Sequence, residues 1–296
     1  MSPGTTTPGT TTPGTGLPRW RAFWERGGLW RAVLAAACYL ALYLLGGLLV
    51  GTWFGDLVDP EDLFATPASV AVGLAAPLLV GAVVLVAFVA SLRWFGVLFA
   101  RQTLPAPRWM WVAPVLVLAP VVLRVLGVDY GAYAPGVVAV TLASGLLVGF
   151  VEEVLCRGVV VTVLRRGGAT EWVVMVMSSL VFALLHSANA LSGMPLGTVA
   201  LTVVYTFGFG VAMYLTLRVT RNLVWPVLLH GLFDPLLFLG TGGIDEVADA
   251  AGQSPLLVLA GPANLLFIAL GVVALFLARS VNRPGGVPEG VGAPAA

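Results

Sequence analysis

The chain alternates between long apolar stretches and short polar segments. Its apolar stretches contain continuous runs of hydrophobic residues rather than a period-two alternation, which indicates helices rather than the strands of a membrane barrel. A helix needs about 20 residues to cross a bilayer. Stretches of this length cover residues 32–54, 68–92, 109–127, 136–164, 172–192, 197–217, 222–240 and 255–278. The pattern therefore predicts an all-α, polytopic transmembrane bundle of about eight spans.

The two ends of the chain differ from this apolar middle. Residues 1–18 repeat Thr, Pro and Gly, and the tail from Arg283 is rich in Gly and Pro. Such segments bury too little apolar surface to offset the entropy of ordering the chain. We therefore expect disorder over 1–28 and 281–296, on either side of a transmembrane helical domain over 29–280.

The basic residues segregate to one side of the predicted spans. All 15 are Arg. The loops that follow the first, third, fifth and seventh stretches contain no Arg; they cover 55–67, 128–135, 193–196 and 241–254. Because Arg and Lys gather in cytoplasmic loops, both termini are predicted to be cytoplasmic. The lack of Lys is typical of a GC-rich bacterial genome, and we expect a multi-pass protein of the inner (cytoplasmic) membrane.

Composition excludes several classes of protein. Hydrophobic residues make up 59% and charged residues 10% of the chain, whereas a soluble domain carries about 25% charged residues. The net charge of +1 argues against nucleic acid as a partner, because nucleic-acid binding needs a basic surface. Cys38 and Cys156 both lie in apolar stretches, so a disulfide framework is not expected. The expected partners are the lipid bilayer and a membrane-bound substrate, and the oligomeric state stays open.

A few ionisable side chains lie within the spans, where a charge costs several kcal/mol. They are Glu152, Glu153 and Arg157 in the fourth span, His186 in the fifth, and His230 and Asp234 in the seventh. At a rise of 1.5 Å per residue, Glu152, His186 and Asp234 each lie about 20 Å from the predicted cytoplasmic end of their span. Similar depths on three helices predict one shared polar cavity. Arg124, near the outer end of the third span, is expected to extend its charge to the interface.

The spacing of these residues indicates a chemistry. Glu153 and Arg157 are four residues apart and can pair on one helix face. Glu152 is rotated from Glu153 by about 100°, so it remains free to act as a general base. His230 and Asp234, also four apart, present an imidazole and a carboxylate together. A Glu and a His can deprotonate water, while a second His stabilises an oxyanion or joins the first around a metal. These groups are sufficient to hydrolyse an amide bond within the membrane.

Three short patterns carry these residues. The fourth span reads EEVLCR from Glu152 to Arg157, the fifth reads FALLH from Phe182 to His186, and the seventh reads HGLFD from His230 to Asp234. In this order, each on a transmembrane helix, they resemble the CPBP family of intramembrane proteases. That family includes the type II CaaX prenyl endoproteases and the bacterial Abi and bacteriocin-immunity proteins. The resemblance covers a core over residues 136–240.

The resemblance implies a role for each site residue: Glu152 and His186 activate water, Glu153 and Arg157 form a supporting pair, and His230 and Asp234 lie on the oxyanion side. The family pattern often has Asn at the last position, and a carboxylate donates a hydrogen bond only when protonated. Asp234 therefore also fits orienting His230 or binding a cation. The family is described both as metalloproteases and as metal-free glutamate proteases. Zn or another divalent metal on His186 and His230 and a metal-free mechanism are thus equally open, and the chain has no His-Glu-x-x-His signature.

The expected function is an intramembrane endopeptidase acting on a membrane-bound peptide or protein. One alternative is a non-proteolytic scaffold or bacteriocin-immunity-type protein that retains the fold. Another is a proton-coupled transporter, because buried carboxylates and histidines also form proton relays; the chain lacks the inverted repeat with broken helices typical of that class. The individual histidines can also be interhelical hydrogen-bond partners, and the Glu153–Arg157 pair can be purely structural. Nothing in the sequence indicates a prenylated substrate.

Overall fold

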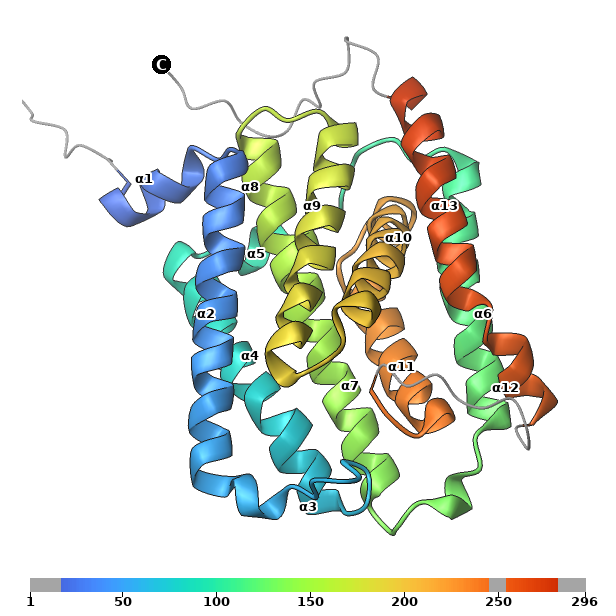
Figure 1. The fold of residues 1–296 in the computed structure, drawn as a ribbon. Helices are drawn as coiled ribbons and strands as arrows, with labels where there is room; N and C mark the ends of the chain where they lie inside the picture. Colours follow the sequence, from blue (N-terminus) through green and yellow to red (C-terminus); the bar gives the residue numbers. More distant parts are fainter. Residues whose placement is uncertain (1–16, 245–253, 282–296) are drawn as a thin grey trace, which may run out of the picture.

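The computed structural model describes residues 17–244 and 254–281, which form helices joined by short turns (Figure 1). Eight helical segments in this part of the chain are long and apolar enough to cross a membrane. They begin and end within a few residues of the stretches expected from the sequence. The all-α transmembrane bundle of eight spans is therefore confirmed, and the chain is a multi-pass membrane protein.

All of the first four spans combine an α-helix with a turn of another helix type. Their segments in chain order are α2 (Leu29–Phe54) with the 3₁₀ turn η1 (Gly55–Leu57); α3 (Pro67–Val70), the π-helical η2 (Ala71–Ala75) and α4 (Ala76–Leu92); η3 (Arg108–Trp111) with α6 (Val112–Gly127); and α7 (Val137–Glu153), the π-helical η5 (Val154–Val160) and α8 (Val161–Arg166). Two short elements, α5 (Phe95–Leu98) and η4 (Tyr130–Ala132), lie between spans.

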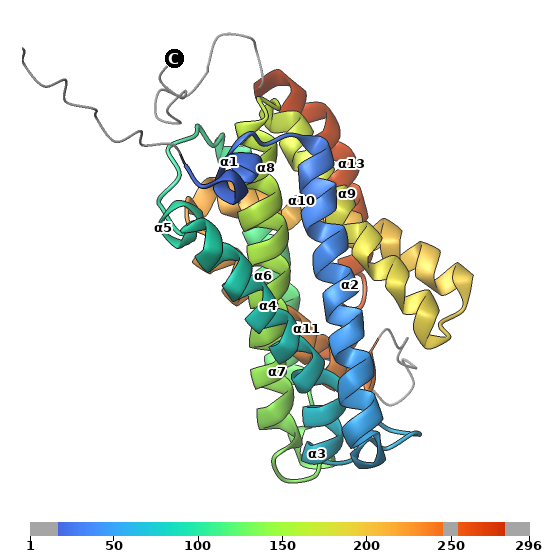
Figure 2. The same cartoon turned by 90° about the vertical axis from the view of Figure 1, so that its left-hand side faces the viewer.

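The last four spans are less interrupted. Their segments are α9 (Glu171–Leu185) with the 3₁₀ segment η6 (His186–Ser192); α10 (Leu196–Thr220); α11 (Val224–Thr241); and α12 (Pro255–Ala260) with α13 (Ala263–Leu277), after which η7 (Ala278–Val281) follows. The turn between η6 and α10 leaves the bundle sideways at about mid-height, whereas α2 and α7 continue to the far end (Figure 2). Residues of η6 and of α2 line the cavity described below.

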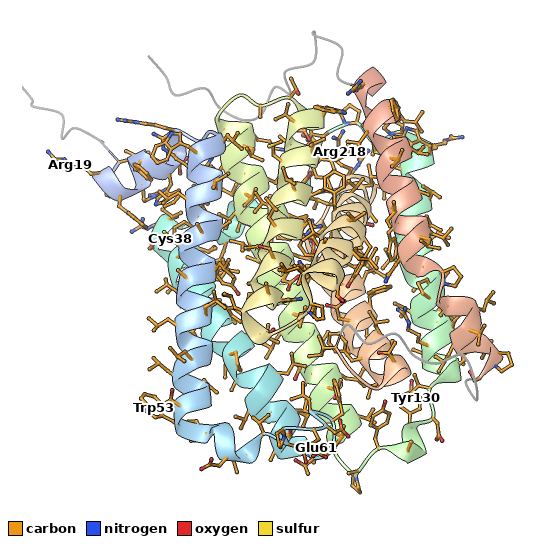
Figure 3. The ribbon with its side chains drawn as sticks, viewed as in Figure 1. Arg19, Cys38, Trp53, Glu61, Tyr130 and Arg218 are labelled. Atoms are coloured by element: carbon orange, nitrogen blue, oxygen red, sulfur yellow. The ribbon has the colours of Figure 1, made fainter. Side chains whose placement is uncertain are left out.

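The two ends of the bundle carry opposite charges. Arg19 and Arg218 lie at one end and Glu61 at the other (Figure 3). We call these the arginine end and the acidic end. The described part of the chain starts and finishes at the arginine end (Figure 1), as an even number of spans requires. That this end faces the cytoplasm stays a prediction.

Helix α1 (Arg19–Glu25) corrects the expectation of disorder over residues 1–28. Trp20 and Trp24 pack edge-on against Phe88 of α4, with ring centres 6.1 and 5.1 Å away, and Trp24 is buried. Aromatic rings that follow the Thr/Pro/Gly repeat bury enough surface to hold this helix on the bundle. The prediction of disorder was based on the average composition of residues 1–28, which is dominated by Thr, Pro and Gly and gives these aromatic residues little weight. Residues 1–16 and 282–296, where disorder was also expected, lie outside the described residues.

Helices α7 and α11 approach closely because two glycines of α7 face α11. A Cβ atom on Gly149 would lie 2.3 Å from the carbonyl oxygen of Val227, and one on Gly145 would lie 2.2 Å from Cγ of Pro235. Small residues four apart allow helix backbones to touch within a membrane. Glu153 follows Gly149 by one turn on the same face, so this contact places the Glu153 carboxylate against α11.

Gly149→Ala is expected to separate α7 from α11 and to lower the free energy of unfolding by about 1–3 kcal/mol, the usual cost of overpacking. The matched control is Gly51→Ala in α2, where a Cβ atom meets nothing within 4 Å. That control should be neutral or slightly stabilising, because Ala favours a helix over Gly. Thermal unfolding of both purified variants in detergent measures the difference. Equal stability of the two variants would show that the close approach is not needed.

Candidate active site

Glu153 and Arg157 form a buried ion pair in the fourth span. Arg157 Nη1 lies 3.0 Å from Glu153 Oε1, and both side chains are inaccessible to solvent. Arg157 Nη2 also donates to the carbonyl oxygen of Gly210 at 2.9 Å, and its guanidinium carbon lies 4.4 Å from the centre of the Phe182 ring. One arginine therefore connects the α7–η5 span to α9 and α10, and it neutralises a carboxylate in a region where a lone charge is costly.

His230 of α11 lies among carboxylates from two helices. Its Nδ1 is 2.8 Å from Glu153 Oε1, its Nε2 is 3.2 Å from Asp234 Oδ2, and the same Nε2 is 3.7 Å from Glu152 Oε2. An ionised carboxylate only accepts hydrogen bonds, so two such partners require a proton on both ring nitrogens. His230 is 1% exposed. The contacts thus place Asp234 where it can orient a buried His230, and that role stays a prediction.

Arg124 is buried inside the bundle, contrary to the expectation that it reaches the interface. Its side chain is 4% exposed, and its guanidinium carbon lies 4.7 Å from the centre of the Phe233 ring. Helix α6 packs against α11 and presents Arg124 to Asp234, with which it interacts electrostatically. Attraction to that carboxylate and stacking on an aromatic face explain why the guanidinium stays inside. Arg124 is therefore a third cation at the site, beside Arg157 and His230.

Glu152, unlike Glu153, faces open space. Together with His186 it lines a cavity of about 530 Å³ between α2, α4, α7 and η6. The Glu152 side chain is 26% exposed, although its Oε2 is buried and lies 3.7 Å from His230 Nε2, beyond hydrogen-bonding distance. The rotation between adjacent helical positions thus separates the two carboxylates. The Glu153 carboxylate forms ion pairs with Arg157 and His230. The Glu152 carboxylate lines the cavity.

His186 is the first residue of η6, directly after α9. Its Nδ1 lies 3.0 Å from the carbonyl oxygen of Phe182. A carbonyl oxygen only accepts, so Nδ1 carries the proton, and in the neutral imidazole Nε2 is left as an acceptor. His186 lines the same cavity as Glu152 and interacts with it electrostatically. Both side chains therefore offer an acceptor to the same cavity.

Phe182 connects two layers of polar groups. Its ring centre lies 5.0 Å from that of His186 and 5.7 Å from that of His230. Behind the ring lies what we call the buried ion cluster: Glu153, Arg157 and His230, which are buried, and Asp234 at its edge, whose side chain is 21% exposed. On the cavity side lies the cavity pair, Glu152 and His186. The structure thus brings all six sequence-predicted site residues into one region, but divides them between a buried layer and an open one.

The donor set does not fit a bound divalent metal. Among residues 17–244 and 254–281, no group of three or more His, Cys, Asp or Glu side chains is arranged to hold a metal ion. Both ring nitrogens of His230 already face carboxylates, so this imidazole has no lone pair to offer. Zinc typically takes three or four protein ligands, and the cavity pair of Glu152 and His186 supplies only two.

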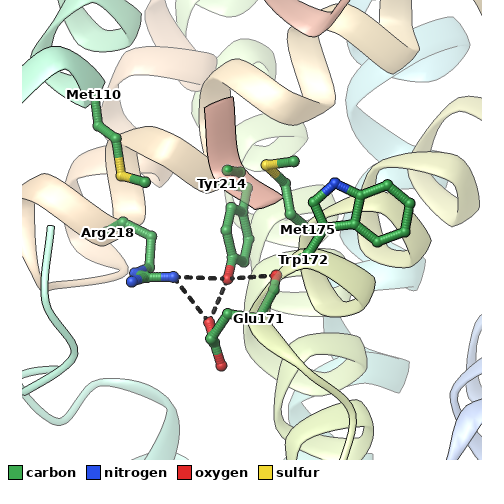
Figure 4. A pocket seen from close by; sticks show the side chains of 7 residues that line it. Met110, Glu171, Trp172, Met175, Tyr214 and Arg218 are labelled. Atoms are coloured by element: carbon green, nitrogen blue, oxygen red, sulfur yellow. Dashed lines mark hydrogen bonds and ion pairs between the residues drawn. The ribbon is translucent and has the colours of Figure 1, made fainter. Parts of the chain in front are cut away.

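A second buried polar cluster lies near the arginine end and was not identified from the sequence. The Tyr214 hydroxyl donates to the Glu171 carboxylate, and Arg218 Nη1 lies 3.1 Å from the same group (Figure 4). Arg165 Nε donates to Glu171 Oε1 at 2.8 Å, and Arg218 also donates to the carbonyl of Pro105. The adjoining cavity measures about 10 Å³, the space of one water molecule. The cluster therefore joins α8, α9 and α10 and has no room for a substrate.

Arg124, Tyr39 and Tyr43 are polar groups at the site that the sequence did not identify as site residues. The tyrosines line the cavity from α2, with ring centres 6.2 Å apart and nearly parallel. The sequence feature that could have identified the two tyrosines is their spacing of four residues on one span. It places both rings on one helix face, but which helix that face meets depends on tertiary packing.

Comparison with known proteins agrees with the resemblance over the middle of the chain. A family model described as type II CAAX prenyl endopeptidase Rce1-like matches residues 134–236. The matched segment contains the buried ion cluster and the cavity pair, and it nearly coincides with the core expected over 136–240. The resemblance to the CPBP proteases is therefore confirmed for this segment. No curated protein and no solved structure matches the chain.

Proposed function

We propose that this chain, whose residues 134–236 match a family of prenyl endopeptidases, is an intramembrane endopeptidase. The observation that carries the proposal is the cavity pair. A carboxylate and an imidazole line one cavity of about 530 Å³ inside a bundle of membrane spans. Ionisable groups within a membrane are costly and usually functional. Here they have the geometry and the space to act on a substrate.

The cavity pair supplies the proton transfers of hydrolysis. Glu152 and Nε2 of His186 accept hydrogen bonds from one water molecule, and Glu152 takes a proton as the water oxygen attacks the carbonyl carbon of the peptide. The same proton then passes to the peptide nitrogen as the carbon–nitrogen bond breaks. The second proton of the water stays on the new carboxyl group, so the products are a carboxylic acid and an amine, which exchange that proton to become a carboxylate and an ammonium group, and Glu152 returns to its starting state.

The buried ion cluster positions Glu152. His230 Nε2 lies 3.7 Å from Glu152 Oε2 and attracts it, while Glu153 holds His230 through Nδ1. Arg157 in turn fixes Glu153. These contacts restrain the rotamer of Glu152 from the side away from the cavity. A base held within a few tenths of an ångström of its working position loses little entropy in the transition state.

The cavity suits a substrate that lies in the membrane. Most of its wall is aliphatic, from residues such as Leu40, Leu44 and Leu48 of α2, and it lies in the membrane-spanning part of the bundle. We infer a membrane-associated peptide or protein substrate, in the cytoplasmic membrane of a bacterium. The matched family is described as acting on prenylated chains; for this protein a lipid group on the substrate is not required by the geometry.

Cleavage in ¹⁸O-labelled water tests the proposal. Purified protein in detergent is incubated with a membrane-tethered peptide, and mass spectrometry should find one ¹⁸O atom in the new carboxyl terminus. His186→Gln should lower the rate by about 10²–10³-fold, because it removes one acceptor of the water. Ser187→Ala is the matched control. Its hydroxyl donates to the Leu184 carbonyl, so this variant should cleave normally.

A chelator separates the metal-free mechanism from a metal-assisted one. Because the donor set does not fit a divalent metal, the rate should be unchanged in EDTA. A loss of activity that Zn²⁺ restores, or full activity of His186→Gln, would contradict the mechanism. If the protein acts normally in cells when Glu152 and His186 are both replaced, it is a non-proteolytic scaffold.

A further inference from the structure

The proposed hydrolysis needs a hydrogen-bond donor for the oxygen of the attacked carbonyl. None of the side chains that the family resemblance implies offers one to the cavity. Nε2 of His186 is an acceptor in the neutral imidazole, since Nδ1 faces the Phe182 carbonyl. Both nitrogens of His230 face carboxylates, and Asp234 is itself an acceptor. The donor must therefore come from another part of the cavity wall.

Four other polar side chains line the cavity: Tyr39, Tyr43, Asn189 and Ser192. Ser192 donates its hydroxyl to the Asn189 carbonyl. Asn189 lies on η6, the segment that also carries His186, and so it shares a wall with the water-binding group. The two tyrosines come from α2, a different wall. Water attacks a carbonyl nearly perpendicular to the C=O bond, so the oxygen points sideways from Glu152 and His186, where a different wall can reach it.

The tyrosine hydroxyls are available to a substrate. Neither has a hydrogen-bond partner among the described residues, and both tyrosines interact electrostatically with Glu152. The pair begins at the level of Glu152, and of the two rings Tyr39 is buried whereas Tyr43 is partly exposed. The start of α2 is joined to the end of α8 by a bond from Gly28 N–H to the Val163 carbonyl at 2.9 Å. From there, at 1.5 Å per residue, Glu152 and Tyr39 each lie about 16 Å along their helices, and Tyr43 lies about 22 Å along, one turn nearer the acidic end.

Packing against α4 sets the position of the pair. A Cβ atom on Gly81 would lie 2.6 Å from the Tyr39 hydroxyl oxygen and 3.1 Å from Cδ2 of Tyr43. Only glycine at this position leaves room for both rings. Tyr39 stacks on Tyr43 with an interplanar angle of 16°, so the donor is held in place before a substrate arrives, as efficient stabilisation of a transition state requires.

We propose that Tyr43, supported by Tyr39, donates its phenolic hydrogen bond to the oxyanion formed during peptide hydrolysis. This inference rests on the proposed function, and it assigns a catalytic residue outside the matched segment 134–236. The proton stays on the tyrosine oxygen throughout. The negative charge that develops on the substrate oxygen is lost again when the carbonyl re-forms and the carbon–nitrogen bond breaks.

Tyr43→Phe tests the assignment, because it keeps the stacked ring and removes only the donor. The expected result is a kcat about 10²–10³-fold lower, the usual effect of losing one oxyanion donor, with KM nearly unchanged. A peptide phosphonate, which mimics the tetrahedral intermediate, should lose a similar factor in affinity. Tyr130→Phe, on the loop at the acidic end, is the matched control and should behave as the unchanged protein.

The outcomes separate this inference from the proposed function. If the unchanged protein cleaves the peptide and Tyr43→Phe has the same kcat and phosphonate affinity, Tyr43 is not the donor and the protease assignment stands. The same holds if Asn189→Ala, rather than Tyr43→Phe, shows both losses. If the unchanged, folded protein neither cleaves the peptide nor binds the phosphonate, the proposed function and this inference both fail.

Discussion

Glu152→Gln is expected to lower the rate of peptide cleavage by about 10²–10⁴-fold, the range attributed to a general base, while the protein remains folded. The amide has the shape of the carboxylate but cannot accept a proton from water. Glu152 lines the cavity, so an amide of the same shape keeps the packing and removes only the attraction between Oε2 and His230 Nε2, 3.7 Å apart. Single-turnover cleavage of a tethered peptide measures the rate, and thermal unfolding in detergent measures stability.

Two controls accompany this variant. Glu61→Gln makes the same chemical change on the exposed loop at the acidic end and should leave cleavage unchanged. Glu153→Gln makes it on the adjacent residue, where it removes the partner of Arg157 and His230, and should lower stability as well as activity. If Glu152→Gln cleaves as fast as the unchanged protein, the carboxylate in the cavity is not the base.

Arg157→Met is expected to lower the free energy of unfolding by about 3–5 kcal/mol, the usual cost of removing one partner of a buried ion pair. Methionine keeps an apolar stem of similar length. It leaves the Glu153 carboxylate without its arginine, and it also removes the bond to Gly210 and the contact with the Phe182 ring. Unfolding of the purified variant in detergent, followed by helical circular dichroism, measures the loss.

The double variant Glu153→Gln with Arg157→Met sharpens this prediction. It removes both charges, so it should be more stable than Arg157→Met alone; coupling of this kind identifies a direct interaction. Arg101→Met, in the exposed loop after α5, is the matched control and should have little effect. A double variant less stable than either single variant would mean that the ion pair does not account for the loss.

Much of the fold could be predicted from the sequence because few backbone structures are stable within a lipid bilayer. A backbone within a bilayer must satisfy its own hydrogen bonds, so each long apolar stretch becomes a helix. The positions and number of the spans followed from this rule alone. The rule does not cover short segments at the interface. Helix α1 was missed because its stability comes from aromatic contacts with Phe88 of α4, a residue more than sixty positions away.

The sequence predicted which residues form the candidate site, but it did not predict how they are arranged in space. Helical spacing placed Arg157 four residues after Glu153 and Asp234 four residues after His230, and both local contacts are present. The contact between Glu153 and His230 at 2.8 Å depends on the close approach of α7 and α11. That approach arises from glycines whose partners lie on another helix.

By itself, the sequence determined the eight helices, the charged groups inside them and the pairs within each helix, because these depend only on hydropathy and helical periodicity. Only the tertiary structure decided which carboxylate is buried and which is open, that Arg124 turns inward, and that two tyrosines from the first span enter the site. These features depend on how distant helices rotate and tilt against one another. Such contacts are set by shape complementarity across the whole bundle, which no local pattern of residues encodes.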